Sequence, residues 1–153
     1  MKKTHYLAGI ALLSATAAMP TFAADECTLD INSNDAMQFD QKELSVPATC
    51  EEVTLNLHHT GTMAKNVMGH NWVLTATEDM QPVATDGMNA GADNDYIKED
   101  DDRVIAHTEV VGGGESTSVT FSIADLNAGD DYSFFCSFPG HVSIMNGKFN
   151  ITE

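Results

Sequence analysis

The chain has 153 residues, of which 42% are hydrophobic and 20% charged, and its 23 acidic residues outnumber its 7 basic ones. The net charge of −16 excludes functions that rely on electrostatic attraction to nucleic acid or anionic lipid, because both would be repelled by such a surface. The length suits one domain with a hydrophobic core and is too short for two.

Residues 1–24 have the pattern of a secretory signal peptide. Two lysines precede an apolar stretch over residues 6–18, and small residues end the segment. Cleavage after Ala23 and cleavage after Ala24 both fit this pattern. The apolar stretch is too short to cross a bilayer as a helix. We therefore expect export, which would leave a domain of residues 25–153 with a net charge of −18.

The three cysteines predict one disulfide and one thiol with a different role, because an exported protein with an odd number of cysteines leaves one unpaired. Cys27 and Cys50 lie in ordinary strand sequence in the N-terminal part, whereas Cys136 lies close to a histidine and a methionine. We expect a disulfide between Cys27 and Cys50, which would stabilise the fold by roughly 3 kcal/mol by closing the loop between them.

Alternating apolar and polar residues predict β-strands along most of the domain. Residues 53–58 alternate strictly. The same pattern recurs in four later runs, which are residues 72–75, 119–123, 132–136 and 149–152. Turn-forming glycine and asparagine residues separate several of the runs. Short alternating runs of this kind predict an all-β, antiparallel sandwich.

One segment, residues 79–88, departs from the alternation and predicts a short helix. Glu78 and Asp79 lie where acidic residues favour the start of a helix, and Pro82 would fall in the first turn, where its missing N–H costs little. We expect a long polar loop over residues 89–102. Its acidic run lacks the glycine that a calcium-binding EF-hand loop requires at its sixth position, so we interpret it as solvated.

A histidine, a cysteine and a methionine lie close together near the C-terminus. Cys136, His141 and Met145 form the motif C-x4-H-x3-M, and a second histidine, His70, lies far upstream. Two imidazoles and a thiolate in a trigonal plane, with a weak axial thioether, are the ligands of blue-copper electron-transfer sites. The motif therefore predicts such a site at the end of a strand.

The segments that contain these residues resemble the azurin family of type 1 blue copper proteins. Residues 66–74 (NVMGHNWVL) are similar to the family's first ligand strand, and residues 134–141 (FFCSFPGH) are similar to its ligand loop. The resemblance extends over residues 25–153, which would form a cupredoxin (plastocyanin-like) copper-binding domain. It implies a Greek-key β-sandwich of about eight strands with a short helical insertion near residues 79–88.

The resemblance also implies a set of ligands for one copper ion. His70, Cys136 and His141 would be equatorial ligands, Met145 an axial thioether, and the carbonyl group of Gly69 a weak second axial contact. Backbone groups at two further positions, Asn71 and Phe138, would stabilise the thiolate. His141 would present an exposed edge through which electrons pass.

An apolar docking patch is implied around His141. Its expected members are Met37, Met63, Val67, Met68, Met88, Phe138, Pro139 and Ile144. Residues 60–64 depart from the family because they lack the prolines often found before the first ligand strand. His59 would be a core histidine satisfied by a hydrogen bond, and His58 and His107 would lie on the surface.

The function implied by the resemblance is that of a periplasmic single-electron carrier whose copper cycles between Cu(I) and Cu(II). The alternative is a copper storage or delivery protein. We do not expect an enzyme, since no Asp or Asn in the ligand loop could orient a Cys–His pair for nucleophilic catalysis. The partners would be periplasmic redox proteins such as c-type cytochromes, nitrite reductase or oxidases. We expect a monomer that neither inserts into a membrane nor binds nucleic acid.

Overall fold

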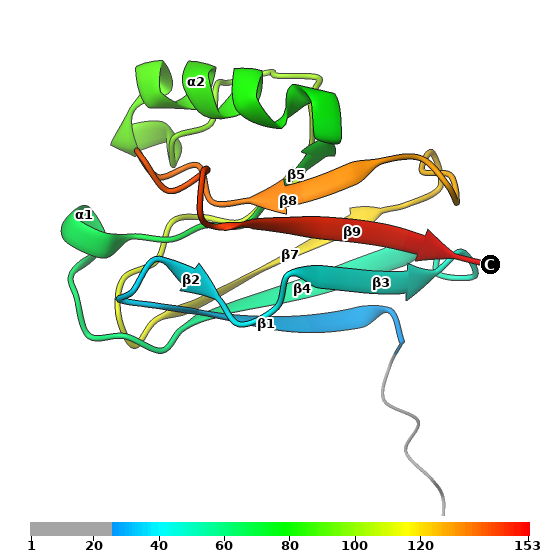
Figure 1. Cartoon of the computed structure of the whole chain (residues 1–153), viewed down its shortest axis with the longest axis horizontal. Coiled ribbons are helices and arrows are strands. Elements are labelled where there is room, and N and C mark those ends of the chain that lie inside the picture. Colours follow the sequence, from blue (N-terminus) through cyan, green and yellow to red (C-terminus); the bar gives the residue numbers. More distant parts are fainter. Residues whose placement is uncertain (1–25) are drawn as a thin grey trace, which may run out of the picture.

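The computed structural model describes residues 26–153, so the expected signal peptide over residues 1–24 lies outside the described part of the chain. Two β-sheets pack face to face, and a helix lies across the outer side of one of them (Figure 1). The four-stranded sheet has the order β2 (Gln38–Phe39), β1 (Thr28–Asn34), β4 (Glu52–His59) and β7 (Ser116–Ser122). The five-stranded sheet has the order β3 (Glu43–Pro47), β9 (Asn146–Thr152), β8 (Tyr132–Phe135), β5 (Val73–Ala76) and β6 (Val104–His107).

The predicted β-sandwich is confirmed, with nine strands in the described residues where about eight were expected. The expectation of a wholly antiparallel arrangement is wrong for two pairs of strands. β1 runs parallel to β4, and β3 runs parallel to β9. Alternation determines which face of a sheet a side chain occupies, but it contains no information on strand direction. Both sheets are therefore mixed.

The main core lies between the two sheets and follows the alternation of the sequence. In β4, Val53, Leu55 and Leu57 are fully buried, whereas the polar residues between them are partly exposed. Trp72, just before β5, and Phe134 of β8 are also fully buried, and their rings lie 6.1 Å apart. These apolar side chains supply the stabilisation of the sandwich, at about 25 cal/mol for each Å² removed from water.

Helix α2 (Met80–Ala90) covers the outer face of the five-stranded sheet above β5 and β8 (Figure 1). Val83 and Ala84 of this helix form a second apolar cluster with Val73 of β5 and Phe135 of β8. The predicted helical insertion is confirmed, with Pro82 in its first turn. Because α2 buries their outer face, β5 and β8 lack the solvent-exposed polar face that alternation suggested.

The segment after α2 is only in part the long polar loop that was predicted over residues 89–102. The helix continues to Ala90, and a 3-10 helix, η2 (Ala92–Asn94), follows after one glycine. A similar 3-10 turn, η1 (Thr77–Asp79), joins β5 to α2. The compact course of this segment brings its residues 95 and 96 close to the loop after β8.

The two ends of the sandwich carry different features. The disulfide between Cys27 and Cys50 ties the start of β1 to the turn before β4, in agreement with the expected pairing. At the opposite end, on the left in Figure 1, lie the one-turn helix α1 (Lys65–Met68), the β1–β2 turn and the loop that follows β8. No helix in the described part of the chain is long and apolar enough to span a membrane.

Candidate metal centre

Backbone hydrogen bonds hold two separated segments of the chain together at this end of the sandwich. His70 precedes β5 and forms two backbone hydrogen bonds with Val111, of 3.0 and 2.8 Å. The loop after β8 folds back on itself, since the N–H of Met145 donates to the His141 carbonyl (2.8 Å) and the N–H of Cys136 donates to the Met145 carbonyl (3.0 Å). The motif C-x4-H-x3-M is thus closed by its own backbone.

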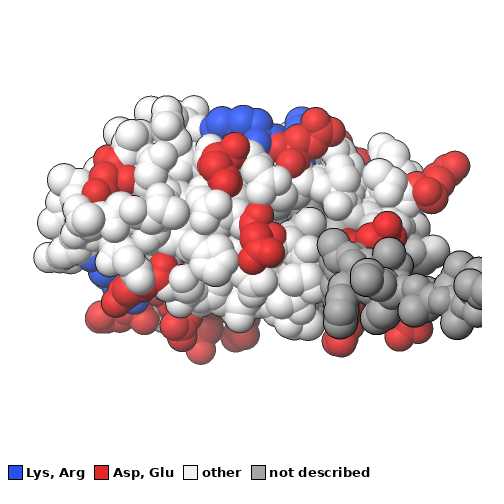
Figure 2. Space-filling model, turned by 90° about the horizontal axis from the view of Figure 1, so that it is seen from below, with Lys and Arg blue, Asp and Glu red and all other residues white. Residues whose placement is uncertain are grey.

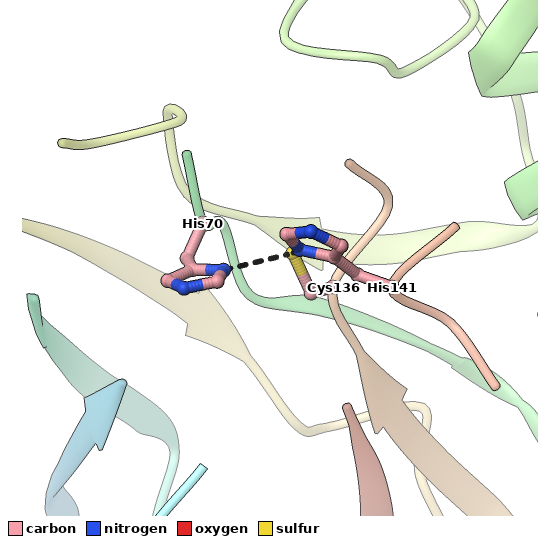
Figure 3. Close-up of side chains that lie close together, drawn as sticks. All are labelled: His70, Cys136 and His141. Atoms are coloured by element: carbon pink, nitrogen blue, oxygen red, sulfur yellow. Dashed lines mark hydrogen bonds between the residues drawn. The ribbon is translucent and has the colours of Figure 1, made fainter. Parts of the chain in front are cut away.

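The side chains of His70, Cys136 and His141 converge in a buried cluster (Figure 3). Nδ1 of His70 lies 3.8 Å from the Cys136 sulfur, and Nδ1 of His141 lies 3.6 Å from it. Within residues 26–153, this is the one group of three or more His, Cys, Asp or Glu donors that could share a metal ion, with its donor atoms within 4.8 Å of one another.

The observed spacing fits a trigonal metal site. Metal–imidazole and metal–thiolate bonds of about 2.0 and 2.3 Å, at an angle of about 120°, would separate the nitrogen and sulfur atoms by about 3.7 Å. Both measured distances lie close to this value. One metal ion can therefore contact all three donors without any large movement of their side chains.

The protonation of the histidines also suits metal binding. Nε2 of His70 lies 2.9 Å from the backbone carbonyl oxygen of Asn34, so this nitrogen carries the proton and Nδ1 keeps its lone pair toward the cluster. Burial lowers the pKa of His70 to about 4 and also lowers the pKa of His141. Both imidazoles are consequently neutral donors at pH 7.

Two opposing influences act on the Cys136 thiol. Complete burial raises its pKa to about 12, because a thiolate without a partner is poorly stabilised away from water. Hydrogen bonds from the backbone N–H groups of Asn71 and Phe138 act in the opposite direction. These two donors come from the residues that the family resemblance singled out, and they are oriented to stabilise negative charge on the sulfur.

The Asn71 side chain links three segments around the site. Its Oδ1 accepts the N–H of Ser137 (2.9 Å), and its Nδ2 donates to the Ser137 hydroxyl (2.8 Å) and to the carbonyl of Asp95 (3.0 Å). Asn71 is fully buried. The residue after Cys136 is therefore fixed to the residue after His70, which keeps the two donor segments in register.

The other residues of the expected ligand set lie at the same place. Met145 is fully buried, and its backbone is bonded to both Cys136 and His141. Gly69 precedes His70, and a Cβ atom there would overlap the Lys65 carbonyl and approach a Val110 methyl group to 2.6 Å. Only glycine leaves the main chain room to pass so close to these neighbours.

Most members of the expected docking patch are exposed. Met63, Val67, Met88 and Ile144 are 42–56% exposed, Pro139 is exposed, and Met37, Met68 and Phe138 are partly buried. His141 is largely buried, with 4% of it reaching solvent, and the Phe138 ring lies 4.7 Å from its own.

His59 takes the core position predicted for it and does not join the three donors. Its Nε2 donates to the Met68 carbonyl (2.8 Å), its Nδ1 accepts the N–H of Gly61 (3.0 Å), and its ring stacks on His70 at 4.6 Å. His58 and His107 lie at the surface, as expected. No sequence pattern points to Asn34, because this residue acts on His70 through a backbone carbonyl that every residue possesses.

Comparisons with known proteins identify a copper-binding family. Residues 25–152 match the family described as copper binding proteins, plastocyanin/azurin family. The chain is 56% identical to the azurin of Bordetella pertussis over 147 residues, which are 96% of this chain and 97% of that protein. It is 52% identical to the azurin of Pseudomonas aeruginosa over 145 residues, covering 95% of this chain and 97% of the relative.

A solved structure shares the fold as well as the sequence. It is an azurin, Az-iso2, from the obligate methylotroph Methylomonas sp. strain J, with a TM-score of 0.81 and 46% identity. The match covers 83% of this chain and 98% of that one.

Proposed function

Because the chain belongs to the plastocyanin/azurin family of copper-binding proteins, we propose that it is a periplasmic single-electron carrier whose one copper ion cycles between Cu(I) and Cu(II). The observation that carries the proposal is the buried cluster of one thiol and two neutral imidazoles at trigonal spacing. Bound copper would supply a one-electron couple, since thiolate suits Cu(I) and imidazole suits both oxidation states.

The protein itself would hold the donors in one arrangement for both oxidation states. His70, Cys136 and His141 would bind the ion, with the Met145 thioether and the Gly69 carbonyl as weak axial contacts. The Asn34 carbonyl would fix the His70 ring. A donor set held in this way changes little when one electron enters or leaves, which favours rapid transfer.

Export of the protein is proposed from the N-terminal sequence. Residues 1–24 would direct the chain to the periplasm and be removed, leaving residues 25–153 as the copper-binding domain. The disulfide between Cys27 and Cys50 supports this location, because such bonds persist in oxidising compartments.

Electrons would pass at the end of the molecule where the copper ligands lie. The apolar patch around His141 would contact periplasmic redox proteins such as c-type cytochromes, nitrite reductase or oxidases, with the protein acting as a monomer. At the left of Figure 2, which is the end that carries α1 in Figure 1, the tip of the molecule is uncharged, and acidic and basic side chains lie behind it. Methionine side chains adapt to several partner surfaces, which suits a shared docking site.

The test of the proposal is the visible absorption spectrum of the protein after addition of Cu(II). We expect an intense band in the red region from thiolate-to-copper charge transfer, which a one-electron reductant bleaches. The matched control is Cys136→Ser, which replaces only the sulfur atom by oxygen and should lack the band. A colourless wild-type protein, or a band that persists in the variant, would contradict the proposal.

Exchange of the bound copper separates a carrier from a storage or delivery protein. Cys136 is completely buried, and only 4% of His141 is exposed to solvent. We expect retention, so a chelator should remove copper slowly. Rapid removal would instead favour delivery.

A further inference from the structure

A groove lies beside the candidate metal centre and has no assigned role. It has a volume of about 550 Å³ and runs between α1 and the segment around η2. Its lining consists of small or aromatic side chains and a few polar ones, namely Ala64, Lys65, Asn66, Ala92, Asp93, Tyr96, Val110 and Phe138. Of these, only Phe138 also belongs to the expected docking patch.

A chain of aromatic rings connects this groove to the metal centre. The Tyr96 ring lies 5.2 Å from the Phe138 ring, which in turn lies 4.7 Å from the ring of His141. A group held in the groove is thus close to a proposed copper ligand. A partner that placed one side chain here would bring its own surface against the end of the molecule where electrons are expected to leave.

The wall of the groove that contains Tyr96 is fixed in place. Asp95 and Tyr96 both have left-handed backbone conformations (φ 50° and 55°), which cost roughly 1–2 kcal/mol each for residues other than glycine. Contacts on both sides maintain them. The Asp95 carboxylate accepts the N–H of Val110 (2.9 Å), and its carbonyl accepts the side-chain amide of Asn71 (3.0 Å). The site is therefore largely formed before any ligand enters.

The charges in and around the groove favour a cation. The Lys65 ammonium group lies 3.7 Å from the Asp95 carboxylate, so these two charges neutralise each other. Asp93 is exposed and has no ion-pair partner within residues 26–153. The adjoining residues 93–103 contain six acidic and two basic side chains. A negative charge is consequently left over at the groove, next to apolar and aromatic surface.

We propose that this groove binds a lysine or arginine side chain of a basic electron-transfer partner. The alkyl stem would lie against Phe138 and Val110, and the cationic head would meet the Asp93 carboxylate near the ring of Tyr96, where a cation–π contact is available. The acidic segment 93–103 would attract such a partner from a distance. The proposal rests on the electron-carrier function proposed above and adds an anchoring site outside the apolar patch.

The test uses the copper-loaded protein and a basic c-type cytochrome at an ionic strength of about 0.01 M, where charges act over about 30 Å. Asp93→Asn should reduce the affinity and the second-order electron-transfer rate about two- to fivefold, the range expected for one exposed ion pair. The matched control is Asp125→Asn, which removes the same charge in the exposed loop between β7 and β8, at the opposite end of the molecule. It should change both values far less.

A third variant gives the sign of the bound charge. Lys65→Gln should increase the affinity for the cytochrome, because it removes a positive charge from the groove wall and releases the Asp95 carboxylate. An acidic partner would produce the reverse pattern, with Lys65→Gln weakening and Asp93→Asn strengthening the complex. That reversal, or equal effects of the Asp93 and Asp125 variants, would overturn the proposal.

NMR titration locates the contact without relying on electron transfer. With both proteins reduced, the amide signals of Ala92, Asp93 and Tyr96 should shift on addition of the cytochrome, and Asp93→Asn should diminish these shifts. Shifts confined to the apolar patch around Ile144 would overturn the groove assignment. A wild-type protein without the red absorption band would contradict the carrier function instead, and the NMR titration would still decide whether the groove binds the basic protein.

Discussion

The Asp101 carboxylate is almost covered, with 4% of its side chain exposed, and it lies against the guanidinium group of Arg103. It accepts hydrogen bonds of 2.7 and 2.6 Å from that group, and Arg103 also binds Asp86 at 2.6 Å. These contacts hold the pKa of Asp101 below its usual range. One arginine thus ties α2 to the turn before β6.

The pH dependence of stability should reveal this contact. Because the folded state favours the charged carboxylate, its contribution to the free energy of unfolding is fully present above the unfolded pKa of about 4. It is lost as the pH falls through the lower pKa of the folded state. Asp101→Asn should therefore be less stable than the wild type at neutral pH.

The measurement is urea unfolding of the two copper-free proteins at a series of pH values. The difference between them should shrink in acid and disappear once Asp101 is protonated in the folded wild-type protein. Asp125→Asn, at an exposed position, serves as the control and should show little difference at any pH. If the difference in the free energy of unfolding between the wild type and Asp101→Asn stays constant down to about pH 2, the charge on Asp101 does not contribute to stability.

The contact between α2 and the segment that follows it depends on a glycine within the helix. A Cβ atom on Gly87 would overlap the carbonyl oxygen of Tyr96. Replacing glycine by alanine in an exposed helix normally stabilises by about 1 kcal/mol. Here the close approach of the two segments should reverse the sign of that effect.

Gly87→Ala should thus lower the free energy of unfolding, by about 1–3 kcal/mol if the neighbouring segment shifts to relieve the overlap. Chemical denaturation of the copper-free protein measures the change. Asn89→Ala, at an exposed position of the same helix, should leave stability nearly unchanged or raise it slightly. A stabilised Gly87 variant would show that the segment around Tyr96 is free to move away.

Sequence periodicity was informative wherever one face of an element meets solvent. It identified β4, where Val53, Leu55 and Leu57 face the core, and it identified α2 from the break in alternation. It also identified β8, but it did not predict that the outer face of this strand is covered, where α2 buries Phe135 as fully as Phe134. Periodicity also could not predict the parallel pairing of strands, since this pairing depends on long connections.

Part of the candidate site could also be predicted from the sequence. The spacing of Cys136, His141 and Met145 within one loop is sufficient to predict that these residues lie together. The residues on either side of His70 resemble the family's first ligand strand, and this resemblance assigns His70 to the same site. The hydrogen bond from His70 to Asn34 joins residues 36 positions apart through a main-chain carbonyl. No side-chain pattern marks such a contact, so only the folded structure reveals it.

Negative charge is the dominant electrostatic feature of the protein. Several basic side chains are already occupied, since Lys65 pairs with Asp95, Arg103 with two aspartates and Lys148 with Asp131. Acidic side chains are spread over the face shown in Figure 2, with few basic ones among them. Repulsion among the remaining carboxylates must therefore oppose the compact state.

Added salt should stabilise the folded protein by screening this repulsion. The melting temperature of the copper-free protein should rise as sodium chloride increases from about 0.01 to 0.15 M, over which the Debye length falls from about 30 to 8 Å. Asp125→Lys should raise the melting temperature at low salt, and its advantage should fade at high salt. If the melting temperature is insensitive to salt, self-repulsion is too weak to influence stability.

The position of β9 determines when the metal centre can form during biosynthesis. This strand, last in chain order, lies between β3 and β8 and pairs Glu43 with Lys148. The five-stranded sheet therefore stays open until residues 146–152 have left the ribosome, and pairing over such long separations is slow. The loop that carries Cys136 and His141 lies between β8 and β9, so it is held against His70 only once β9 has joined the sheet, and metal loading should follow closure of the sheet.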